Sequence, residues 1–197
     1  METTQQRCGW CIGDALYEDY HDREWGVPEH REQRLFEFLI LEGAQAGLSW
    51  ITVLKKRECY RRVMNEFDPI VIAGWGEEKI VALMQEAGII RNRRKLQSTV
   101  ENARAFLRIQ DSYGGFDNYI WRFVEGETVQ NTWASLQEVP AQTPAAIQMS
   151  KDLKKHGFAF VGPTICYAFM QAVGMVNDHI VSCFRHQELR DGISKKR

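Results

Sequence analysis

Residues 41–50 read Leu41-Glu42-Gly43-Ala44-Gln45-Ala46-Gly47-Leu48-Ser49-Trp50 and continue an apolar run that begins at Leu35. At helical spacing Glu42 shares a face with Leu35 and Phe38, so a helix here would bury its carboxylate. A buried carboxylate is unfavourable unless it gains a partner. The glycines allow a close backbone approach, and Ser49 can cap a second helix that starts at Trp50. The segment is therefore either a ligand site or a helix–turn–helix in which Glu42 caps a neighbouring element.

The bulk composition is that of a globular protein. The chain has 197 residues, of which 44% are hydrophobic and 11% aromatic. This length predicts one domain, or two small ones that share a core. The polar start, Met1 to Arg7, indicates no signal peptide, and the apolar run 160–176 contains Pro163 and is better interpreted as a buried helix than as a membrane span. Five cysteines without an export signal favour free thiols or metal ligands over disulfides, in a reducing, cytoplasmic setting.

The formal net charge of −1 limits how the chain could bind nucleic acid. Domains that bind nucleic acid are usually basic, so any such function must depend on local patches. The basic patches are Lys55-Lys56-Arg57, Arg61-Arg62, Arg91-Asn92-Arg93-Arg94-Lys95, and Lys151 with Lys154-Lys155. Each patch is also typical of a solvated helix face.

Helical periodicity dominates the chain, and neither sustained alternation nor a βαβ rhythm is present. The sequence therefore predicts an all-α protein. The predicted helices run from Asp14 to about His21, from about Glu32 to Gln45, from Trp50 to about Phe67, a short one from Asp68-Pro69, from Glu77 to Glu86, from Asn92 to about Gln110, from Thr143-Pro144 to about His156, and from Gly162-Pro163 to about Val173. The segment from Phe116 to Val124 is short and aromatic. Residues 125–142 are polar and predict a loop.

Two pairs of possible metal ligands stand at opposite ends of the chain. Cys8 and His21 form one pair, and His179 and Cys183 form the other, where a helix would place both side chains on one face. Two thiolates and two imidazoles suit a closed, structural Zn²⁺ site, which would offset the entropy of closing so long a loop. The pairs can equally be unrelated residues, and Cys8 with Cys11 can be a redox C-x-x-C motif.

The aromatic residues near the Glu42 segment can be core or can enclose a flat ligand. They are Trp10, Tyr17, Tyr20 and Trp50. Rings attract cations and a buried carboxylate regains a partner from one, so this set favours a planar, cationic ligand.

Residues 156–164 predict a hairpin between two helices. Its glycines, among them Gly162, and the free N–H groups at Thr164 could hold a phosphate. Residues 87–91 form a second, weaker candidate, and either segment can also be a simple tight turn.

Together these segments resemble one family, DNA-3-methyladenine glycosylase I, a bacterial enzyme of alkylation repair. The resemblance covers residues 7–183. The matching segments are Arg7-Cys8-Gly9-Trp10, Tyr17 to Pro28, residues 41–57, Ala87-Gly88-Ile89-Ile90-Arg91, and Phe160-Val161-Gly162 through Thr164-Ile165-Cys166-Tyr167 to Val176-Asn177-Asp178-His179.

The resemblance implies one helix–hairpin–helix glycosylase unit over residues 1–197. It implies a helical core at about 30–175 and terminal segments at about 7–28 and 176–185 that one structural Zn²⁺ joins. The implied zinc ligands are Cys8, His21, His179 and Cys183. It also implies a monomer, with no membrane partner, that acts on double-stranded DNA containing 3-methyladenine.

The resemblance further assigns roles in base recognition. It implies that Glu42 and Tyr20 hydrogen-bond the flipped base, and that Trp10, Tyr17 and Trp50 form the walls of its pocket. Extrusion of a base from the duplex costs a few kcal/mol, and each stacked aromatic returns about 1–3 kcal/mol. Two or three such contacts with Glu42 would therefore cover the cost.

The resemblance also bears on DNA contacts and on the chemistry. Gly47 and Leu48 are expected where the gap left by the flipped base must be filled. Many related enzymes carry an aspartate where this chain has Asn177, and we expect the adjacent Asp178 to point elsewhere on a helix. Methylation at N3 makes adenine a cation that departs as a neutral base, so a strong general base is not essential.

Two alternative functions stay open on the residues alone. One is a zinc-stabilised, non-enzymatic protein that binds DNA or a free purine. The other is a redox or metal-buffer protein built on Cys8 and Cys11.

Overall fold

The computed structural model describes residues 5–192, and within that range the chain is mostly helical. The predicted fold class is therefore confirmed at this level. The elements are η1 Gly9–Cys11, α1 Ala15–Arg23, α2 Glu32–Gln45, α3 Trp50–Leu54, α4 Arg57–Val63, η2 Asn65–Phe67, α5 Pro69–Ala73, α6 Glu77–Gln85, α7 Arg93–Tyr113, α8 Phe116–Trp121, η3 Arg122–Val124, β1 Val129–Gln130, η4 Leu136–Glu138, α9 Pro144–Lys155, α10 Pro163–Ala172, β2 Val176–Asn177 and α11 Phe184–Arg190.

Four helices begin at the capping residue that the sequence predicts. The side chains of Asp14, Asp68, Asn92 and Thr143 accept hydrogen bonds from backbone N–H groups in the first turns of α1, α5, α7 and α9. These bonds satisfy donors that a helix cannot satisfy internally. Local capping thus fixes where these helices start.

The single helix predicted from Trp50 to Phe67 is wrong. The segment forms α3, α4 and η2, with breaks after Leu54 and Val63. The first break turns the buried Arg57 toward Glu24, where the two side chains form an ion pair at 2.7 Å. The second break is a left-handed turn in which residues 65–67 all have positive φ. Tertiary contacts therefore override the helical periodicity here.

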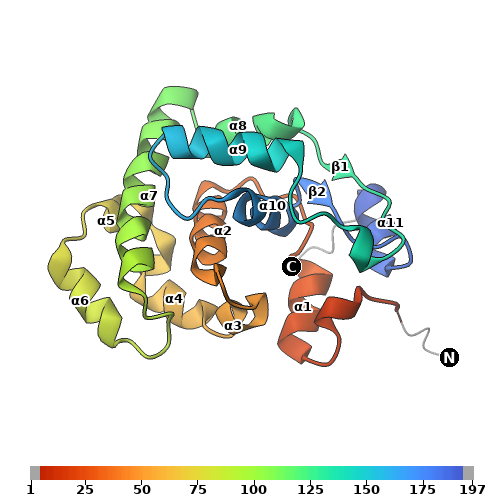
Figure 1. Cartoon of the computed structure of the whole chain (residues 1–197), viewed down its shortest axis with the longest axis horizontal. Helices are drawn as coiled ribbons and strands as arrows, with labels where there is room; N and C mark the ends of the chain where they lie inside the picture. The colour runs from red at the N-terminus through yellow and green to blue at the C-terminus, as the bar shows by residue number, and fades with distance from the viewer. Residues whose placement is uncertain (1–4, 193–197) are drawn as a thin grey trace.

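Helix α2 lies at the centre of the molecule, beside α10, and the long helix α7 packs between α2 and the short helices α5 and α6 (Figure 1). Ten of its residues, 35–44, are buried, so the predicted apolar run is the core of the protein. The Phe36 ring of α2 packs against the Phe106 ring of α7 in a tilted arrangement, with ring centroids 5.0 Å apart. Phe106 in turn lies 4.4 Å from Phe116 of α8. This apolar centre holds the C-terminal end of α2, and with it Glu42, in place.

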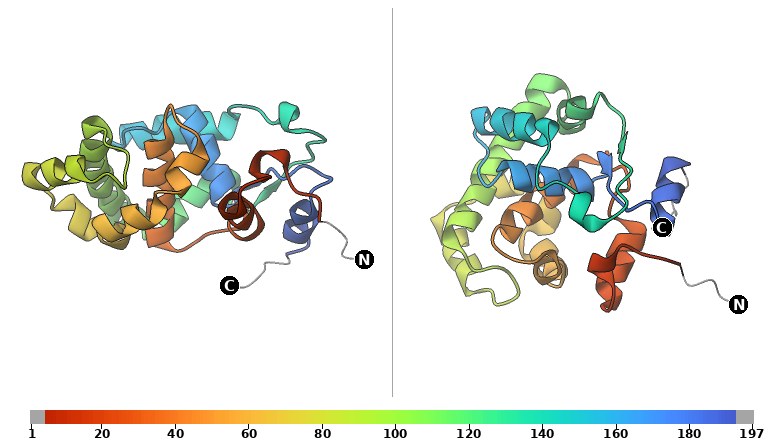
Figure 2. Two further views of the ribbon diagram at one scale, coloured as in Figure 1. Left: turned by 90° about the horizontal axis from the view of Figure 1, so that it is seen from below. Right: turned by 45° about the vertical axis from the view of Figure 1, so that its right-hand side comes forward.

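The N-terminal and C-terminal segments lie at the same end of the molecule, where α1 and α11 are found (Figures 1 and 2). The Phe184 N–H donates to the Gln6 carbonyl at 2.9 Å. Near them β1 and β2 form a short parallel pair, with Val129 opposite Val176. The sequence pattern did not predict this pair, because two-residue strands carry no periodicity.

Within residues 5–192 no helix is long and apolar enough to cross a membrane. The apolar run 160–176 instead contains α10, half of whose residues are buried. Its interpretation as a buried helix is confirmed. The polar segment at the start of the chain lies partly outside the described residues.

Candidate functional site

A cavity of about 420 Å³ opens beside the C-terminal half of α2. Helices α1, α2, α3 and α10 and the segment around η4 contribute to its wall. The lining residues are Trp10, Tyr17, Tyr20, Trp25, Glu42, Gln45, Trp50, Leu136, Val139, Pro140, Ala141, Thr164, Tyr167, Ala168, Gln171 and Asp178. All five residues predicted for base recognition therefore lie around one cavity.

Glu42 reaches this cavity from the buried face of α2. Its side chain is only 3% exposed, and Oε2 has no hydrogen-bond partner within the described part of the chain. Burial raises the pKa of Glu42 to about 8. A carboxyl group that is buried without a partner at a cavity wall is suited to receive hydrogen bonds or positive charge from a ligand.

The aromatic side chains form a connected cluster around the cavity. The rings of Trp10 and Tyr17 lie 4.7 Å apart, and those of Tyr20 and Trp50 lie 5.4 Å apart. Trp10 connects the two pairs through Tyr20 at 6.5 Å. Burial and the nearby Glu42 raise the pKa of Tyr20 well above its ordinary value, so its hydroxyl stays a neutral hydrogen-bond donor. Flat apolar walls with one carboxyl group favour a planar ligand.

A buried ion pair supports the Tyr20 ring from behind. Arg57 of α4 lies over this ring, with its guanidinium carbon 6.0 Å from the centroid. Both Arg57 and Arg34 bond to Glu24, at 2.7 Å in each case. The network joins α1 to α2 and α4, and thereby fixes the aromatic wall relative to Glu42.

The expectation that Asp178 points away from the site is wrong. Residues 178–183 are not helical, and Asp178 is 1% exposed in the cavity wall. Its Oδ1 accepts from Asn131 Nδ2 at 2.6 Å and Trp133 Nε1 at 2.8 Å. Its Oδ2 accepts from the Tyr167 hydroxyl at 2.5 Å and Gln171 Nε2 at 2.7 Å. Four donors engage this carboxylate, so it organises the wall rather than offering a free oxygen.

Asn177 lies in β2, outside the cavity lining. Its Nδ2 donates to Gln130 Oε1 at 2.8 Å and to the His186 carbonyl at 3.1 Å. These bonds tie β2 to β1 and to α11. The side chain at this position is thus structural, and the carboxylate that faces the cavity belongs to the next residue.

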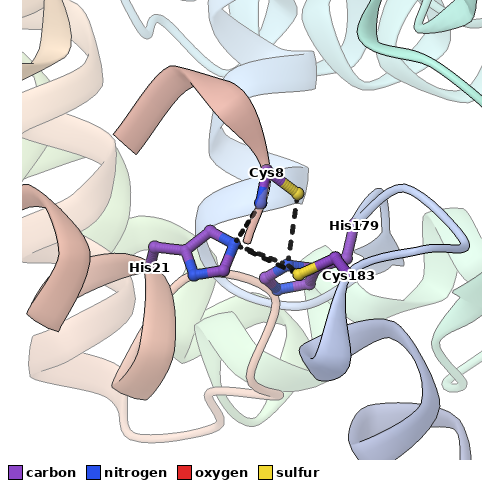
Figure 3. Close-up of side chains that lie close together, drawn as sticks. All are labelled: Cys8, His21, His179 and Cys183. Atoms are coloured by element: carbon purple, nitrogen blue, oxygen red, sulfur yellow. Dashed lines mark hydrogen bonds between the residues drawn. The ribbon is translucent and has the colours of Figure 1, made fainter. Parts of the chain in front are cut away.

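The four predicted metal ligands come together in one buried cluster (Figure 3). Their ligand atoms all lie within 4.8 Å of one another. His21 Nε2 and His179 Nδ1 are 3.1 Å apart, and Cys183 Sγ lies 3.5 Å from each. Cys8 Sγ lies 3.7 Å from His179 Nδ1. This cluster could hold a metal ion that connects the N-terminal and C-terminal segments.

Both imidazoles are held by their second ring nitrogen. His21 Nδ1 lies 2.8 Å from Asp22 Oδ1, and Arg7 holds the same carboxylate through bonds of 2.8 to 3.1 Å. His179 Nε2 lies 3.1 Å from the Trp25 carbonyl. These contacts leave His21 Nε2 and His179 Nδ1 directed into the cluster, as ligating imidazoles require.

Two details of the cysteine and histidine prediction are corrected or clarified. His179 and Cys183 do not lie on a helix, because a turn closed by the Cys183 N–H and the Ile180 carbonyl brings them together before α11. Cys11 lies outside the four-residue cluster, and its thiol donates to the Cys8 carbonyl at 3.1 Å. Burial raises its pKa to about 12, which does not favour a reactive thiolate.

The predicted DNA-contact residues lie in two exposed places near the cavity. Gly47 has φ +81° and Leu48 is 40% exposed, in the turn between α2 and α3. Ser49 precedes α3, but its hydroxyl lies 2.7 Å from Thr52 Oγ1 and caps no backbone N–H. Gly162 is the N-cap residue of α10, and Thr164 is exposed in its first turn and lines the cavity.

Sequence reasoning missed part of the cavity wall. The sequence predicts a loop over residues 125–142, but it does not predict that four of these residues line the cavity: Leu136, Val139, Pro140 and Ala141. Trp25, Tyr167, Gln171 and Asp178 were also not assigned to it. No periodicity marks a loop that folds over a pocket, although the isolated apolar residues of 136–141 in a polar stretch were an available signal.

Comparison with known proteins identifies the family. The methyladenine glycosylase family matches residues 10–186. The chain belongs to the methyladenine glycosylase family. It is 52% identical to DNA-3-methyladenine glycosylase 1 of Escherichia coli (strain K12), over 90% of this chain and 95% of that protein.

Solved structures of methyladenine glycosylases have the same fold. A crystal structure of 3-methyladenine DNA glycosylase I matches with a TM-score of 0.89 and 54% identity, over 91% of this chain and 98% of the other. A variant of 3-methyladenine DNA glycosylase I in complex with 3-methyladenine matches with a TM-score of 0.88 and 34% identity, over 90% and 96%. The resemblance read from the sequence and the expectation of a glycosylase enzyme are confirmed.

Proposed function

We propose that this methyladenine glycosylase hydrolyses the N-glycosidic bond of 3-methyladenine in alkylated double-stranded DNA. The observation that carries the proposal is Glu42, a buried and unpartnered carboxyl group in the wall of an aromatic cavity of about 420 Å³. That volume lies within the usual range of small-ligand pockets, about 300–1,000 Å³. The named relatives support the same substrate.

In this proposal the damaged base leaves the duplex and enters the cavity. Trp10, Tyr17 and Trp50 stack against its faces, which offsets the loss of stacking in the duplex. Glu42 and Tyr20 read its edge. The methylated base in DNA carries a positive charge, and a positively charged partner stabilises the ionised carboxylate of Glu42.

The chemical step needs little from the protein beyond this recognition. A water oxygen forms a bond to C1′ of the deoxyribose while the bond from C1′ to the base breaks. The bonding electron pair goes to the base, which leaves as neutral 3-methyladenine, and a water proton is released to solvent. Asp178 already accepts four hydrogen bonds, so it shapes the wall and does not hold the attacking water.

DNA contacts are assigned to the exposed loops. We assign gap filling to Gly47 and Leu48, and phosphate binding to Gly162 and Thr164 at the start of α10. Helices α9 and α10, joined by residues 156–162, then act as a helix–hairpin–helix unit. The net charge of −1 predicts modest duplex affinity with a steep salt dependence. We further propose a cytoplasmic monomer that forms one unit.

The metal in the cluster is proposed to be one structural Zn²⁺ per chain. Tetrahedral zinc with bonds of about 2.0–2.3 Å places its ligand atoms about 3.3–3.8 Å apart. Cys183 Sγ lies 3.5 Å from His21 Nε2 and from His179 Nδ1, and Cys8 Sγ lies 3.7 Å from His179 Nδ1, all within this range, while the two imidazole nitrogens are slightly closer, at 3.1 Å. With Cys8 the four protein ligands leave no open position, so the ion would hold the terminal segments and take no part in hydrolysis.

The proposed function is tested by base release from N-methylated duplex DNA. We expect the wild type to release 3-methyladenine. Glu42→Gln and Trp50→Ala should lower excision far more than they lower duplex binding, because both side chains act on the flipped base. No release from folded, metal-loaded wild type would reject the proposed reaction in favour of a non-enzymatic reader, and equal losses of binding and excision would reject the role of Glu42.

A further inference from the structure

Helix α7 holds the backbone of two exposed loops, one through Lys95 and one through Asn102. Lys95 is half-buried, and its Nζ donates to the Ala44 carbonyl at 2.8 Å and to the Ala46 carbonyl at 2.7 Å. These carbonyls lie at the C-terminal end of α2. Carbonyl groups in the last turn of a helix lack intrahelical partners, and an ammonium group is a suitable donor for them.

Residues 46–49 form the turn that follows α2, and we name them the extrusion turn. Lys95 holds the start of this turn through its bond to the Ala46 carbonyl. Within it Gly47 adopts φ +81°, and the Leu48 N–H donates to the Gln45 carbonyl at 2.6 Å. Leu48 is 40% exposed and is not part of the hydrophobic core. The turn therefore has little packing of its own, and the bond from Lys95 to the Ala46 carbonyl anchors it to α7.

Asn102 holds the second loop, the hairpin of residues 156–162. Its Nδ2 donates to the Ala159 carbonyl at 3.0 Å, and its Oδ1 accepts from the Ala159 N–H at 2.8 Å. Asn102 is only 3% exposed, so both bonds are shielded from water. The hairpin includes Gly157 at φ +91° and Phe160 at φ +56°, conformations that need such support.

The two anchors belong to one rigid frame. Lys95 and Asn102 are seven residues apart, which places them on one face of α7 at about 10 Å along its axis. The hairpin also touches α2 directly, since a Cβ added to Gly43 would lie 3.4 Å from Phe160 Cβ. These contacts therefore fix three elements relative to one another: the extrusion turn, the hairpin, and helix α2, which carries Glu42.

We propose that Lys95 and Asn102 are positioning residues for excision from duplex DNA, because they hold the extrusion turn and the hairpin at a fixed separation. The inference rests on the proposed function, and it adds two residues that contact neither the cavity nor the base. A duplex that is held by the hairpin and opened at the extrusion turn needs both loops at once. A free base needs only the cavity.

The test compares excision from duplex DNA with binding of free 3-methyladenine, followed by tryptophan fluorescence. Lys95→Met removes both hydrogen bonds at nearly constant volume, and we expect kcat/KM on methylated duplex to fall by about tenfold to a hundredfold. The Kd for the free base should stay within about twofold of wild type. Lys95→Arg should restore most of the duplex activity, because a guanidinium can also donate to both carbonyls.

The matched control is Arg104→Met. Arg104 is an exposed cation of the same helix, and its Nε donates at 2.9 Å to the Ala73 carbonyl at the end of α5. The control therefore loses the same charge and the same kind of bond away from the two loops. Its activity on duplex DNA should remain close to that of the wild type.

Asn102→Asp provides a second, independent variant, because it keeps the acceptor for Ala159 N–H and removes the donor. We expect the same loss on duplex DNA with free-base binding kept. Parallel loss of duplex excision and free-base binding in either variant would overturn the proposal, as would wild-type activity in both. A wild type that releases no base would instead overturn the proposed function.

Discussion

In the proposed function, base recognition depends on Glu42, and the protonation state of this side chain sets a pH dependence. Burial raises the pKa of this carboxyl group to about 8, so it is mostly protonated at pH 7 in the empty cavity. A cationic base is stabilised by the ionised form. Recognition of the methylated base in DNA should therefore strengthen as the pH rises toward 8.

We predict that kcat/KM on duplex DNA rises as the pH increases from about 6 and levels off above about 8. Well below the pKa the slope should approach about tenfold per pH unit, because kcat/KM reports groups that titrate in the free enzyme. A pH–rate series at constant ionic strength measures this. Glu42→Gln, which cannot ionise, should show a lower and flatter profile, and an unchanged slope in this variant would remove Glu42 as the titrating group.

Asp178 illustrates a carboxylate whose role is to organise other side chains. Replacement by asparagine places an amide N–H₂ among four donors, so at least one buried donor loses its acceptor. We expect Asp178→Asn to lower the free energy of unfolding by about 1–3 kcal/mol. Urea denaturation measures the change. Asp111→Asn, at an exposed position of α7, is the control, and equal stability of the two variants would contradict the structural role.

At the scale of elements, local chemistry predicts helix starts better than helix continuity. Asp14, Asp68 and Thr143 mark the observed starts because a cap depends on neighbouring residues alone. The division of residues 50–67 depends on the distant Glu24, which pairs with Arg57, and no periodicity could reveal it.

The same distinction applies to the candidate site. The residues alone singled out Glu42, because a carboxylate interrupts an apolar helix face, but they left open whether it binds a ligand or caps an element. The ligand types of the two Cys/His pairs suggested a metal, and the resemblance to the family, not the spacing, joined the pairs into one site. The orientation of Asp178 was not predictable from the sequence. It follows from the pairing of β2 with β1 and from hydrogen-bond donors at positions 131, 133, 167 and 171. Segment 136–141 likewise acquires its place in the wall only through the tertiary fold.

A prediction at the scale of elements concerns Leu48 in the extrusion turn. Leu48 is 40% exposed, so its truncation should cost little stability. If the side chain fills the gap in the duplex, Leu48→Ala should lower excision from duplex DNA while free 3-methyladenine binds as before. Ile70→Ala is the matched control, because Ile70 is 72% exposed on α5. Equal excision by Leu48→Ala, Ile70→Ala and wild type would remove gap filling from this residue.

At the scale of the whole molecule, the Cys/His cluster brings together segments that are far apart in the chain. Cys8 and His21 come from the N-terminal segment and His179 and Cys183 from the C-terminal one. Between them, Asp178 and Trp25 belong both to the surroundings of the cluster and to the cavity wall. A metal there would stabilise the closed arrangement of α1 and α11 and would keep one side of the cavity in place.

We therefore predict that the main effect of metal removal is a loss of stability, because the proposed ion takes no part in the chemical step. A ligand at about a thousandfold above its Kd stabilises the folded state by about 4 kcal/mol. For a chain of this length, loss of the metal should lower Tm by about 8–16 °C, which calorimetry with and without a chelator measures. Cys8→Ser should reproduce the loss and release the metal. Cys11→Ser should retain one zinc per chain, because its thiol lies outside the cluster. An unchanged Tm after verified metal removal would show that the contacts of α1 and α11 hold the ends together without it.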